Sequence, residues 1–102
     1  MAARHRVTWS RQARHGLDEI LGYIARDSPS AAERMLDEVI GAAESLSALG
    51  ERGRIVPELD EPTVRELLVG RYRLIYEVGA AEIVVLAVVH GARSLSLRWR
   101  AR

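Results

Sequence analysis

Two adjacent stretches in the last third of the chain constrain its fold more than any other feature. The first covers residues 69–78 and the second residues 83–93, with a short turn at residues 79–81 between them. The second stretch is apolar from Ile83 to Val89, which predicts a strand buried on both faces of a sheet. A connection this short forces antiparallel pairing, so we expect the two strands to lie side by side.

Both strands carry basic residues at the same end. Arg71 and Arg73 belong to the first strand, and the second ends in His90-Gly91-Ala92-Arg93. Positive charge at the rim of a buried sheet predicts a surface that binds an acidic partner.

Arg73 has two interpretations, which the sequence leaves open. Strand alternation puts an apolar set on the opposite face, where we expect it to pack on helices: Tyr72, Leu74, Tyr76 and Val78. Arg73 would then lie on the open face of the sheet, where an acidic ligand could reach it. The alternative is a cross-strand ion pair with Glu66, Glu77 or Glu82.

The first half of the chain predicts a short strand and two helices. Residues 5–9 suit a strand, and Ser10 is a suitable N-cap for a helix over residues 11–26. Ser28 and Pro29 begin a second helix, whose apolar stripe reaches about residue 49. We expect core or core-edge positions for Trp9, Tyr23 and Met35. We expect solvated helix faces for Asp18, Glu19, Asp37, Glu38 and Glu44.

The second half predicts a sheet. Residues 50–62 form a loop with a brief extended piece at residues 54–56. Three consecutive strands follow, at residues 64–69, 72–78 and 82–89. The prediction is therefore an α+β fold: an N-terminal strand, an α-helical hairpin and a three-stranded antiparallel meander. Together the strands would form a curled antiparallel sheet of about four strands, as a single domain over residues 1–102. Its second face would be open or partly covered by residues 94–102.

Composition excludes several kinds of chemistry. There is no cysteine, which excludes disulfides and thiolate metal sites, and all 15 basic residues are arginine. His5, His15 and His90 lack metal-ligand spacing, so we expect no metal and no cofactor. No apolar run approaches the length of a membrane span, and no apolar run typical of a secretory signal follows the basic N-terminus. The sequence predicts a cytoplasmic protein with no membrane partner.

Charge is unevenly distributed although the net charge is only +1. Residues 1–16 hold four arginines and no acid, and residues 17–61 hold 11 acids against four arginines. Residues 64–102 hold seven arginines against three acids. The two ends of the chain can therefore share a basic face opposite an acidic one.

Three groups of motifs, taken in order, carry a resemblance to a known family. A helix-hairpin group reads Leu17-Asp18-Glu19-Ile20, Tyr23-Ile24-Ala25, Asp27-Ser28-Pro29 and Ala31-Ala32. A loop group reads Gly53-Arg54 and Pro57-Glu58-Leu59. A sheet group reads Arg65-Glu66, Val69-Gly70-Arg71-Tyr72-Arg73-Leu74-Ile75-Tyr76 and Val89-His90-Gly91-Ala92-Arg93. In this order they resemble the RelE/ParE superfamily of bacterial type II toxins, and the ParE branch most closely. The resemblance covers most of the chain.

The resemblance implies the toxin of a type II toxin–antitoxin system, neutralised by a cognate antitoxin in a hetero-oligomer. ParE-like members inhibit DNA gyrase and block replication without being conventional enzymes, and they would meet DNA only through gyrase or the antitoxin. The alternative is a RelE-like, ribosome-dependent mRNA endoribonuclease. A second alternative is a non-toxic antitoxin-binding module, because fold does not fix function.

Two sets of candidate site residues follow. The expected partner-binding residues are Arg71, Arg73, His90, Arg93, Arg98 and Trp99. In the ribonuclease alternative, the resemblance implies that Glu58, Arg73 and His90 cleave RNA, with a base, a cation and an acid acting at one phosphate. Three features disfavour that alternative: Gly91-Ala92 follows His90, the net charge is low, and lysine is absent.

Overall fold

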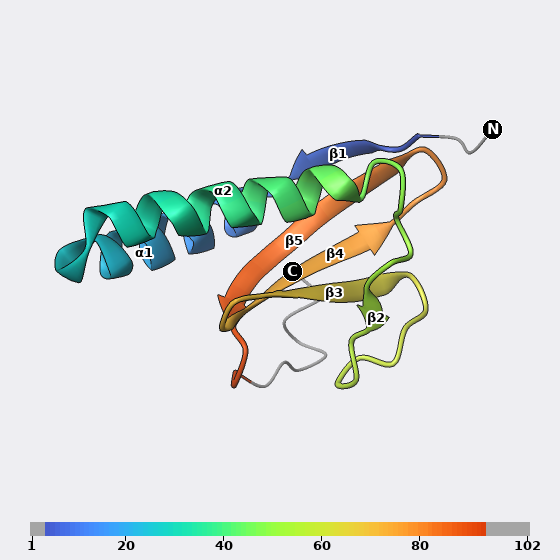
Figure 1. Ribbon diagram of the computed structural model, residues 1–102. Coiled ribbons are helices and arrows are strands. Elements are labelled where there is room, and N and C mark those ends of the chain that lie inside the picture. The colour runs from blue at the N-terminus through green and yellow to red at the C-terminus, as the bar shows by residue number, and fades with distance from the viewer. Residues whose placement is uncertain (1–3, 94–102) are drawn as a thin grey trace.

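The computed structural model describes residues 4–93 and shows two helices on one face of a five-stranded sheet (Figure 1). The elements in order are β1 (Arg6–Trp9), α1 (Arg11–Asp27), α2 (Pro29–Ser45), β2 (Arg54–Ile55), β3 (Val64–Val69), β4 (Tyr72–Val78) and β5 (Glu82–His90). This confirms an α+β fold with an N-terminal strand, a helical hairpin and then antiparallel strands. The curl of the sheet stays a prediction.

Serine side chains cap both helices, as the sequence predicts. Ser10 Oγ accepts the N–H of Ala13 at 3.0 Å and donates to the carbonyl of Leu86 at 3.0 Å. This cap therefore also joins α1 to the central strand β5. Ser28 Oγ accepts the N–H of Ala31 at 3.1 Å at the start of α2. The bonds to the N–H groups of Ala13 and Ala31 each satisfy a backbone donor that the first helical turn leaves without a partner.

Helix α2 is shorter than predicted, because it ends at Ser45 rather than near residue 49. The N–H of Leu46 bonds to the carbonyl of Ala43 at 3.1 Å, which tightens the last turn and ends the α-helix. Leu46 is fully buried, whereas Leu49 is exposed. The apolar stripe that predicted a longer helix therefore stops contributing to the core at Leu46.

The sheet has the strand order β1-β5-β4-β3-β2. Strands β2 to β5 pair antiparallel, but β1 pairs parallel to β5, from Arg6 opposite Glu82 to Trp9 opposite Val85. The sheet is therefore mixed, and the prediction of an antiparallel sheet of about four strands is wrong. Short turns dictate antiparallel pairing only between consecutive strands. No short turn joins β1 to β5, because the two helices and three other strands lie between them in the sequence. The extended piece predicted at residues 54–56 contributes the fifth strand, β2.

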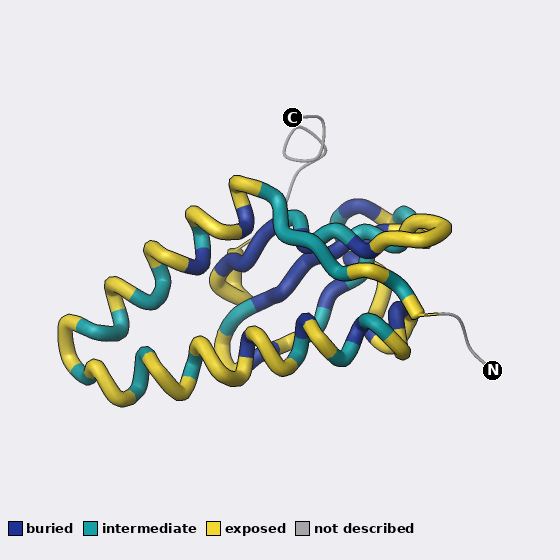
Figure 2. The backbone as a smooth tube through the Cα atoms, turned by 90° about the horizontal axis from the view of Figure 1, so that it is seen from above, coloured by how far each residue is buried: buried dark blue, intermediate teal, exposed yellow. Residues whose placement is uncertain are grey.

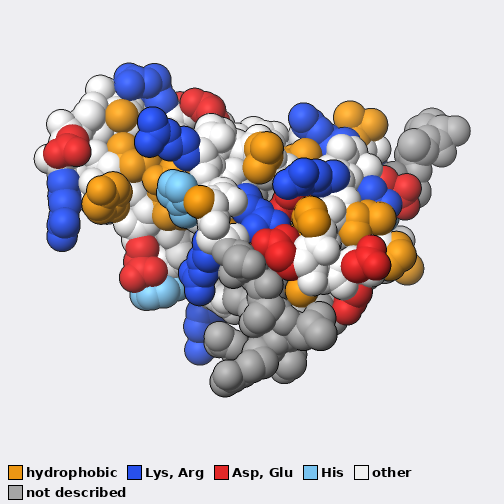
Figure 3. Space-filling model, turned by 90° about the horizontal axis from the view of Figure 1, so that it is seen from below, with side chains coloured by type: hydrophobic (Ala, Val, Ile, Leu, Met, Phe, Trp, Pro, Cys, Tyr) orange, Lys and Arg blue, Asp and Glu red, His pale blue; other side chains and the backbone are white. Residues whose placement is uncertain are grey.

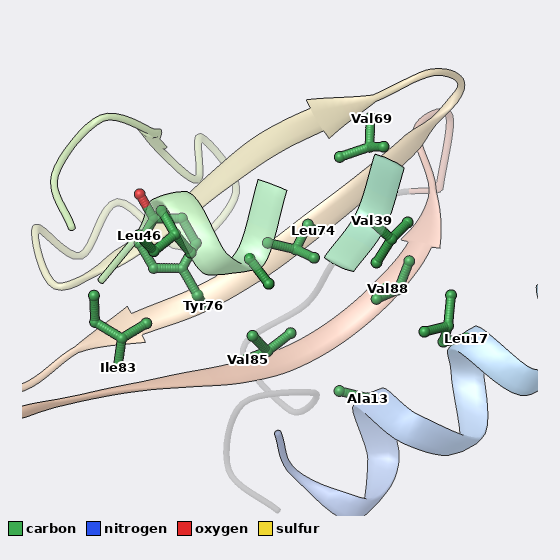
Figure 4. Packing of buried hydrophobic residues seen from close by; sticks show 11 residues of the cluster. Ala13, Leu17, Val39, Leu46, Val69, Leu74, Tyr76, Ile83, Val85 and Val88 are labelled. Atoms are coloured by element: carbon green, nitrogen blue, oxygen red, sulfur yellow. The ribbon is translucent and has the colours of Figure 1, made fainter. Parts of the chain in front are cut away.

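Side chains pack on both faces of the sheet. The cluster beneath the helices contains Ala13, Leu17, Val39, Ala43, Leu46, Val69, Leu74, Tyr76, Ile83, Val85 and Val88 (Figure 4). The cluster on the opposite face contains Val56, Leu59, Val64, Ile75, Ala87 and Val89. Strand β5 contributes to both, which confirms that it is buried on its two faces. The second face is not open as predicted, because the loop between β2 and β3 brings Val56 and Leu59 onto it. Residues 94–102 lie outside the described residues.

The helical hairpin projects beyond the sheet (Figures 1 and 2). Its buried residues all lie near the sheet: Ala13, Leu17, Val39 and Ala43. No residue between 18 and 38 is buried. Tyr23, in the projecting part, is 68% exposed, so its predicted core or core-edge position is wrong. Trp9 and Met35 pack against the core as predicted, and the five helix carboxylates predicted to be solvated are exposed.

Candidate functional site

Arg73 lies at the centre of a buried charge network on the sheet face opposite the helices. Only 4% of its surface is exposed. Its Nε donates to Glu66 Oε1 at 2.6 Å, and its Nη1 and Nη2 donate to the two carboxylate oxygens of Glu58, each at 2.8 Å. Nη1 also donates to the backbone carbonyl of Arg93 at 2.8 Å. The planar guanidinium thus uses its fork to bind two carboxylates at once.

A second arginine completes this network. Arg54 stands opposite Glu66 in the β2–β3 pairing and donates its Nε to Glu66 Oε2. The buried charge network therefore consists of the buried pair Glu66 and Arg73 together with partly buried Glu58 and exposed Arg54, and its two positive and two negative charges balance. Figure 3 shows arginine and carboxylate side chains lying together near the middle of this face. Such balance is what permits Glu66, only 1% exposed, to remain buried.

The structure corrects one interpretation of Arg73 and confirms the other. Alternation correctly separates Arg73 from Leu74 and Tyr76, which pack under the helices. The expectation that an acidic ligand could reach Arg73 is wrong, because the guanidinium is buried and bound to two carboxylates of the chain itself. The cross-strand ion pair with Glu66 is confirmed.

The buried charge network also fixes the ionisation of Arg73. The hydrogen bond that Arg73 donates to Glu58 is the largest influence and raises the pKa of Arg73, burial lowers it, and Glu66 raises it further. The net result is a pKa above the ordinary value of an arginine. Arg73 therefore stays protonated and cannot act as an acid or a base.

The loop that carries Glu58 is attached to the sheet by a close approach at Gly53. The N–H of Gly53 donates to Tyr76 Oη at 2.9 Å in the interior. A Cβ at this position would lie 2.5 Å from both Tyr76 Oη and the carbonyl oxygen of Glu66, so only glycine fits. Burial raises the pKa of Tyr76, which keeps its hydroxyl neutral beside this amide. The hydrogen bond between Gly53 and Tyr76 therefore holds the loop where Glu58 can bind Arg73.

A surface groove lies between α1 and the ends of β4 and β5. Its main hollow, about 410 Å³, is lined by Glu19, Ile20, Tyr23, Arg71, Tyr72 and His90. An adjoining hollow of about 290 Å³ shares four of these residues and adds Arg93. We call these two hollows the end groove. Figure 3 shows hydrophobic side chains gathered on the underside of the projecting hairpin, next to histidine and arginine. The exposed residues Arg71, His90 and Arg93, all predicted to bind a partner, meet in this groove.

His90 faces the end groove and not the buried charge network. It stands opposite Tyr72 in the β4–β5 pairing, and the two rings meet edge to face with centroids 5.7 Å apart. Arg73 stands opposite Val89, and directly opposed residues share a face of the sheet. The structure therefore brings Glu58 and Arg73 together but places His90 on the other side of the sheet.

The chain turns sharply after His90. The N–H of Ala92 donates to His90 Nδ1 at 3.1 Å, so the neutral imidazole carries its proton on Nε2. The N–H of Gly91 donates to the carbonyl of Arg71 at 2.7 Å, and the N–H of Arg93 donates to the carbonyl of His90 at 3.0 Å. These bonds hold the turn that contains Arg93 against Arg71, which lies in the turn between β3 and β4.

Sequence reasoning missed the helical side of the end groove. Glu19, Ile20 and Tyr23 were expected to be solvated or buried residues of an ordinary amphipathic helix, and they line the groove instead. No spacing signal marks them, because the apolar stripe of α1 continues unbroken past Leu17 while the sheet beneath it ends. The remaining predicted partner-binding residues, Arg98 and Trp99, lie outside the described residues.

Residues 4–93 contain neither a cluster of potential metal ligands nor a helix that could span a membrane. Among these residues, no group of three or more histidine, aspartate or glutamate side chains could hold a metal ion. Neither α1 nor α2 is long and apolar enough to cross a membrane.

Comparison with known proteins identifies relatives along nearly the whole chain. Residues 7–95 match the family described as "ParE toxin of type II toxin-antitoxin system, parDE". The chain is 36% identical over 88 residues to Toxin RelE2 of Caulobacter vibrioides, covering 85% of this chain and 96% of the relative. It is 32% identical over 93 residues to Putative toxin Y4kP of Sinorhizobium fredii, covering 86% and 90%.

Two solved structures share the fold. One is the chromosomal ParDE toxin–antitoxin system from P. aeruginosa, with a TM-score of 0.69, 22% identity, and 85% and 96% of the two chains covered. The other is the toxin–antitoxin complex RelBE2 from Mycobacterium tuberculosis, with a TM-score of 0.57, 21% identity, and 91% and 98% covered. This likeness shows that the chain shares its fold with these two solved structures. The family match and the sequence relatives go further: the chain belongs to the ParE toxin family of type II toxin–antitoxin systems.

Proposed function

We propose that this toxin inhibits DNA gyrase by binding it and that a cognate antitoxin neutralises it. One observation carries the choice of a binding role over a catalytic one. The residues that could cleave RNA are not assembled, because Arg73 is 4% exposed and bound to Glu58 while His90 faces the opposite side of the sheet. The protein would then act by contact with another enzyme.

An mRNA endoribonuclease needs a different arrangement. Cleavage at a ribose 2′-OH requires a base, a cation and an acid within reach of one phosphate. Here Glu58 and Arg73 bind each other through two hydrogen bonds of 2.8 Å, so their oxygens and N–H groups already face one another. A phosphate that reached Arg73 would have to displace a carboxylate and would still lie across the sheet from His90.

The end groove is the proposed contact surface. Its aromatic and aliphatic lining lies beside Arg71, His90 and Arg93, and arginine and aromatic side chains are enriched at the centres of protein interfaces. An apolar segment with carboxylates would match this combination. The two structural relatives come from a ParDE system and a RelBE2 toxin–antitoxin complex, which supports an antitoxin as one occupant. The expected assembly is a toxin–antitoxin hetero-oligomer.

Pulse-labelling after tightly controlled induction tests this function. Gyrase inhibition predicts that DNA synthesis falls within minutes while translation continues. An early fall in translation would instead contradict the proposal and favour the ribonuclease alternative. No growth defect at all would identify a non-toxic antitoxin-binding module.

A supercoiling assay with purified gyrase then tests the surface. We expect Arg71→Ala to weaken inhibition at least about tenfold, the size expected of an interface hot spot. Arg6→Ala is the matched control, because Arg6 is also exposed and stands opposite Glu82, at the far end of β5 from His90. Equal inhibition by the two variants would exclude the end groove as the gyrase contact.

A further inference from the structure

One hydrogen bond connects the buried charge network to the end groove. Arg73 Nη1 donates to the backbone carbonyl of Arg93 at 2.8 Å, and the side chain of Arg93 helps to line the groove. Arg73 itself does not line either hollow of the groove. The guanidinium therefore binds the backbone of Arg93, while the side chain of the same residue lines the groove.

The acceptors of Arg73 come from three separate parts of the chain. Glu66 lies on the neighbouring strand β3, Glu58 lies in the loop between β2 and β3, and Arg93 follows the end of β5. The two carboxylates fix the guanidinium plane, because one binds at Nε and the other binds both terminal nitrogens. One Nη1 proton remains, and its direction is then set towards the Arg93 carbonyl.

We propose that Arg73 is a positioning residue for partner binding. It contacts no partner, but it fixes the backbone of Arg93 and so holds the Arg93 side chain at the end groove. This inference rests on the proposed function, since it takes the end groove to be the partner-binding surface. It also predicts that lysine cannot replace Arg73: a lysine could balance the charge but could not bind two carboxylates and a carbonyl in one plane.

A double-mutant cycle on the intact protein tests the proposal. The measured quantity is the affinity for the antitoxin encoded beside the toxin gene, with Arg73→Lys, Arg93→Ala and the double variant. We expect Arg73→Lys to weaken binding about fivefold or more in the wild-type background and by less than about twofold when Arg93 is already alanine. Independent, additive losses would overturn the proposal, because they would mean that Arg73 acts on the partner without Arg93.

Arg54→Lys is the matched control. Arg54 also binds Glu66, but no hydrogen bond joins its side chain to Arg93 among the described residues. A general loss of stability would weaken binding in both lysine variants, whereas positioning of Arg93 predicts a loss only in Arg73→Lys. Equal losses in the two variants, at matched thermal stability, would contradict the proposal.

Limited trypsin digestion gives a readout that needs no partner. To cleave after Arg93, trypsin must attack the carbonyl carbon of Arg93, whose oxygen is the atom that Arg73 binds. We expect cleavage after Arg93 to be at least about fivefold faster in Arg73→Lys and unchanged in Arg54→Lys. Unchanged cleavage in Arg73→Lys would overturn the positioning role even if the antitoxin binds. Failure of the wild-type protein to bind antitoxin would instead contradict the proposed function, and this digestion would still test Arg73.

Discussion

Glu66 and Arg73 show how this protein keeps charged side chains in its interior. They are 1% and 4% exposed, yet both are fully hydrogen-bonded: Glu66 binds two arginines, and Arg73 binds two carboxylates and one backbone carbonyl. Removing one partner is more harmful than replacing a whole pair, because the remaining charge stays buried without compensation. The buried charge network is therefore sensitive to any change of a single charge.

Glu66→Gln should destabilise the fold strongly. The amide keeps the shape of the side chain but leaves Arg54 and Arg73 with a single carboxylate between them, that of Glu58. We expect the free energy of unfolding to fall by about 3 to 5 kcal/mol in urea denaturation. Glu38→Gln, on an exposed face of α2, is the control and should change it by less than about 0.5 kcal/mol. A similar small change for both variants would show that the network contributes little.

Tyr76 should make stability depend on pH in the alkaline range. Its pKa in the folded protein is raised above the ordinary value of 10.0, mainly by burial. A raised folded-state pKa gives stability that is present below about pH 10 and is lost as the pH rises further. The chain has no lysine or cysteine, so no other type of side chain titrates near this range. Urea denaturation at pH 8 to 11 measures the decline.

Tyr76→Phe identifies the group responsible. The variant should lose most of the alkaline decline and about 1 to 3 kcal/mol at neutral pH, because the buried N–H of Gly53 loses its acceptor. Tyr23→Phe is the control, since Tyr23 is 68% exposed and should leave both quantities unchanged. An alkaline decline that persists in Tyr76→Phe would contradict the assignment.

At the scale of single elements, the loop between β2 and β3 depends on one glycine. Gly53→Ala would place a Cβ 2.5 Å from backbone and hydroxyl oxygens, so we expect a loss of at least about 2 kcal/mol in the free energy of unfolding. Gly41→Ala in α2 meets no atom within 4 Å and should stabilise by about 0.5 to 1 kcal/mol. We therefore expect the two glycine-to-alanine substitutions to change the free energy of unfolding in opposite directions. Equal changes would contradict the close approach at Gly53.

The projecting part of the helical hairpin should matter for binding and not for folding. Tyr23→Ala removes a ring that is 68% exposed, so we expect unfolding to change by less than about 0.5 kcal/mol. Antitoxin affinity should fall at least about tenfold, because the ring lines the end groove. Leu17→Ala, on the buried part of the same helix, should cost about 2 to 5 kcal/mol. Unchanged affinity in folded Tyr23→Ala would remove the hairpin from the interface.

At the scale of the whole molecule, local signals predicted the elements better than their assembly. Ser10 and Ser28 mark the helix starts because capping involves only neighbouring residues, and the continuous apolar run of β5 reflects burial on two faces. The burial of Arg73 was not predictable in the same way. It depends on a loop that folds back through the Gly53 contact, and nothing in residues 53–59 shows where that loop goes.

The parallel pairing of β1 with β5 has a consequence for synthesis of the protein. The first strand of the described chain finds its neighbour in the last one, and β5 is also the strand on which α1 packs. A growing polypeptide therefore cannot complete its sheet until β5 has left the ribosome. The end groove, the proposed binding surface, should therefore form only after β5 and the turn that follows His90 have been synthesised, because both contribute residues to it.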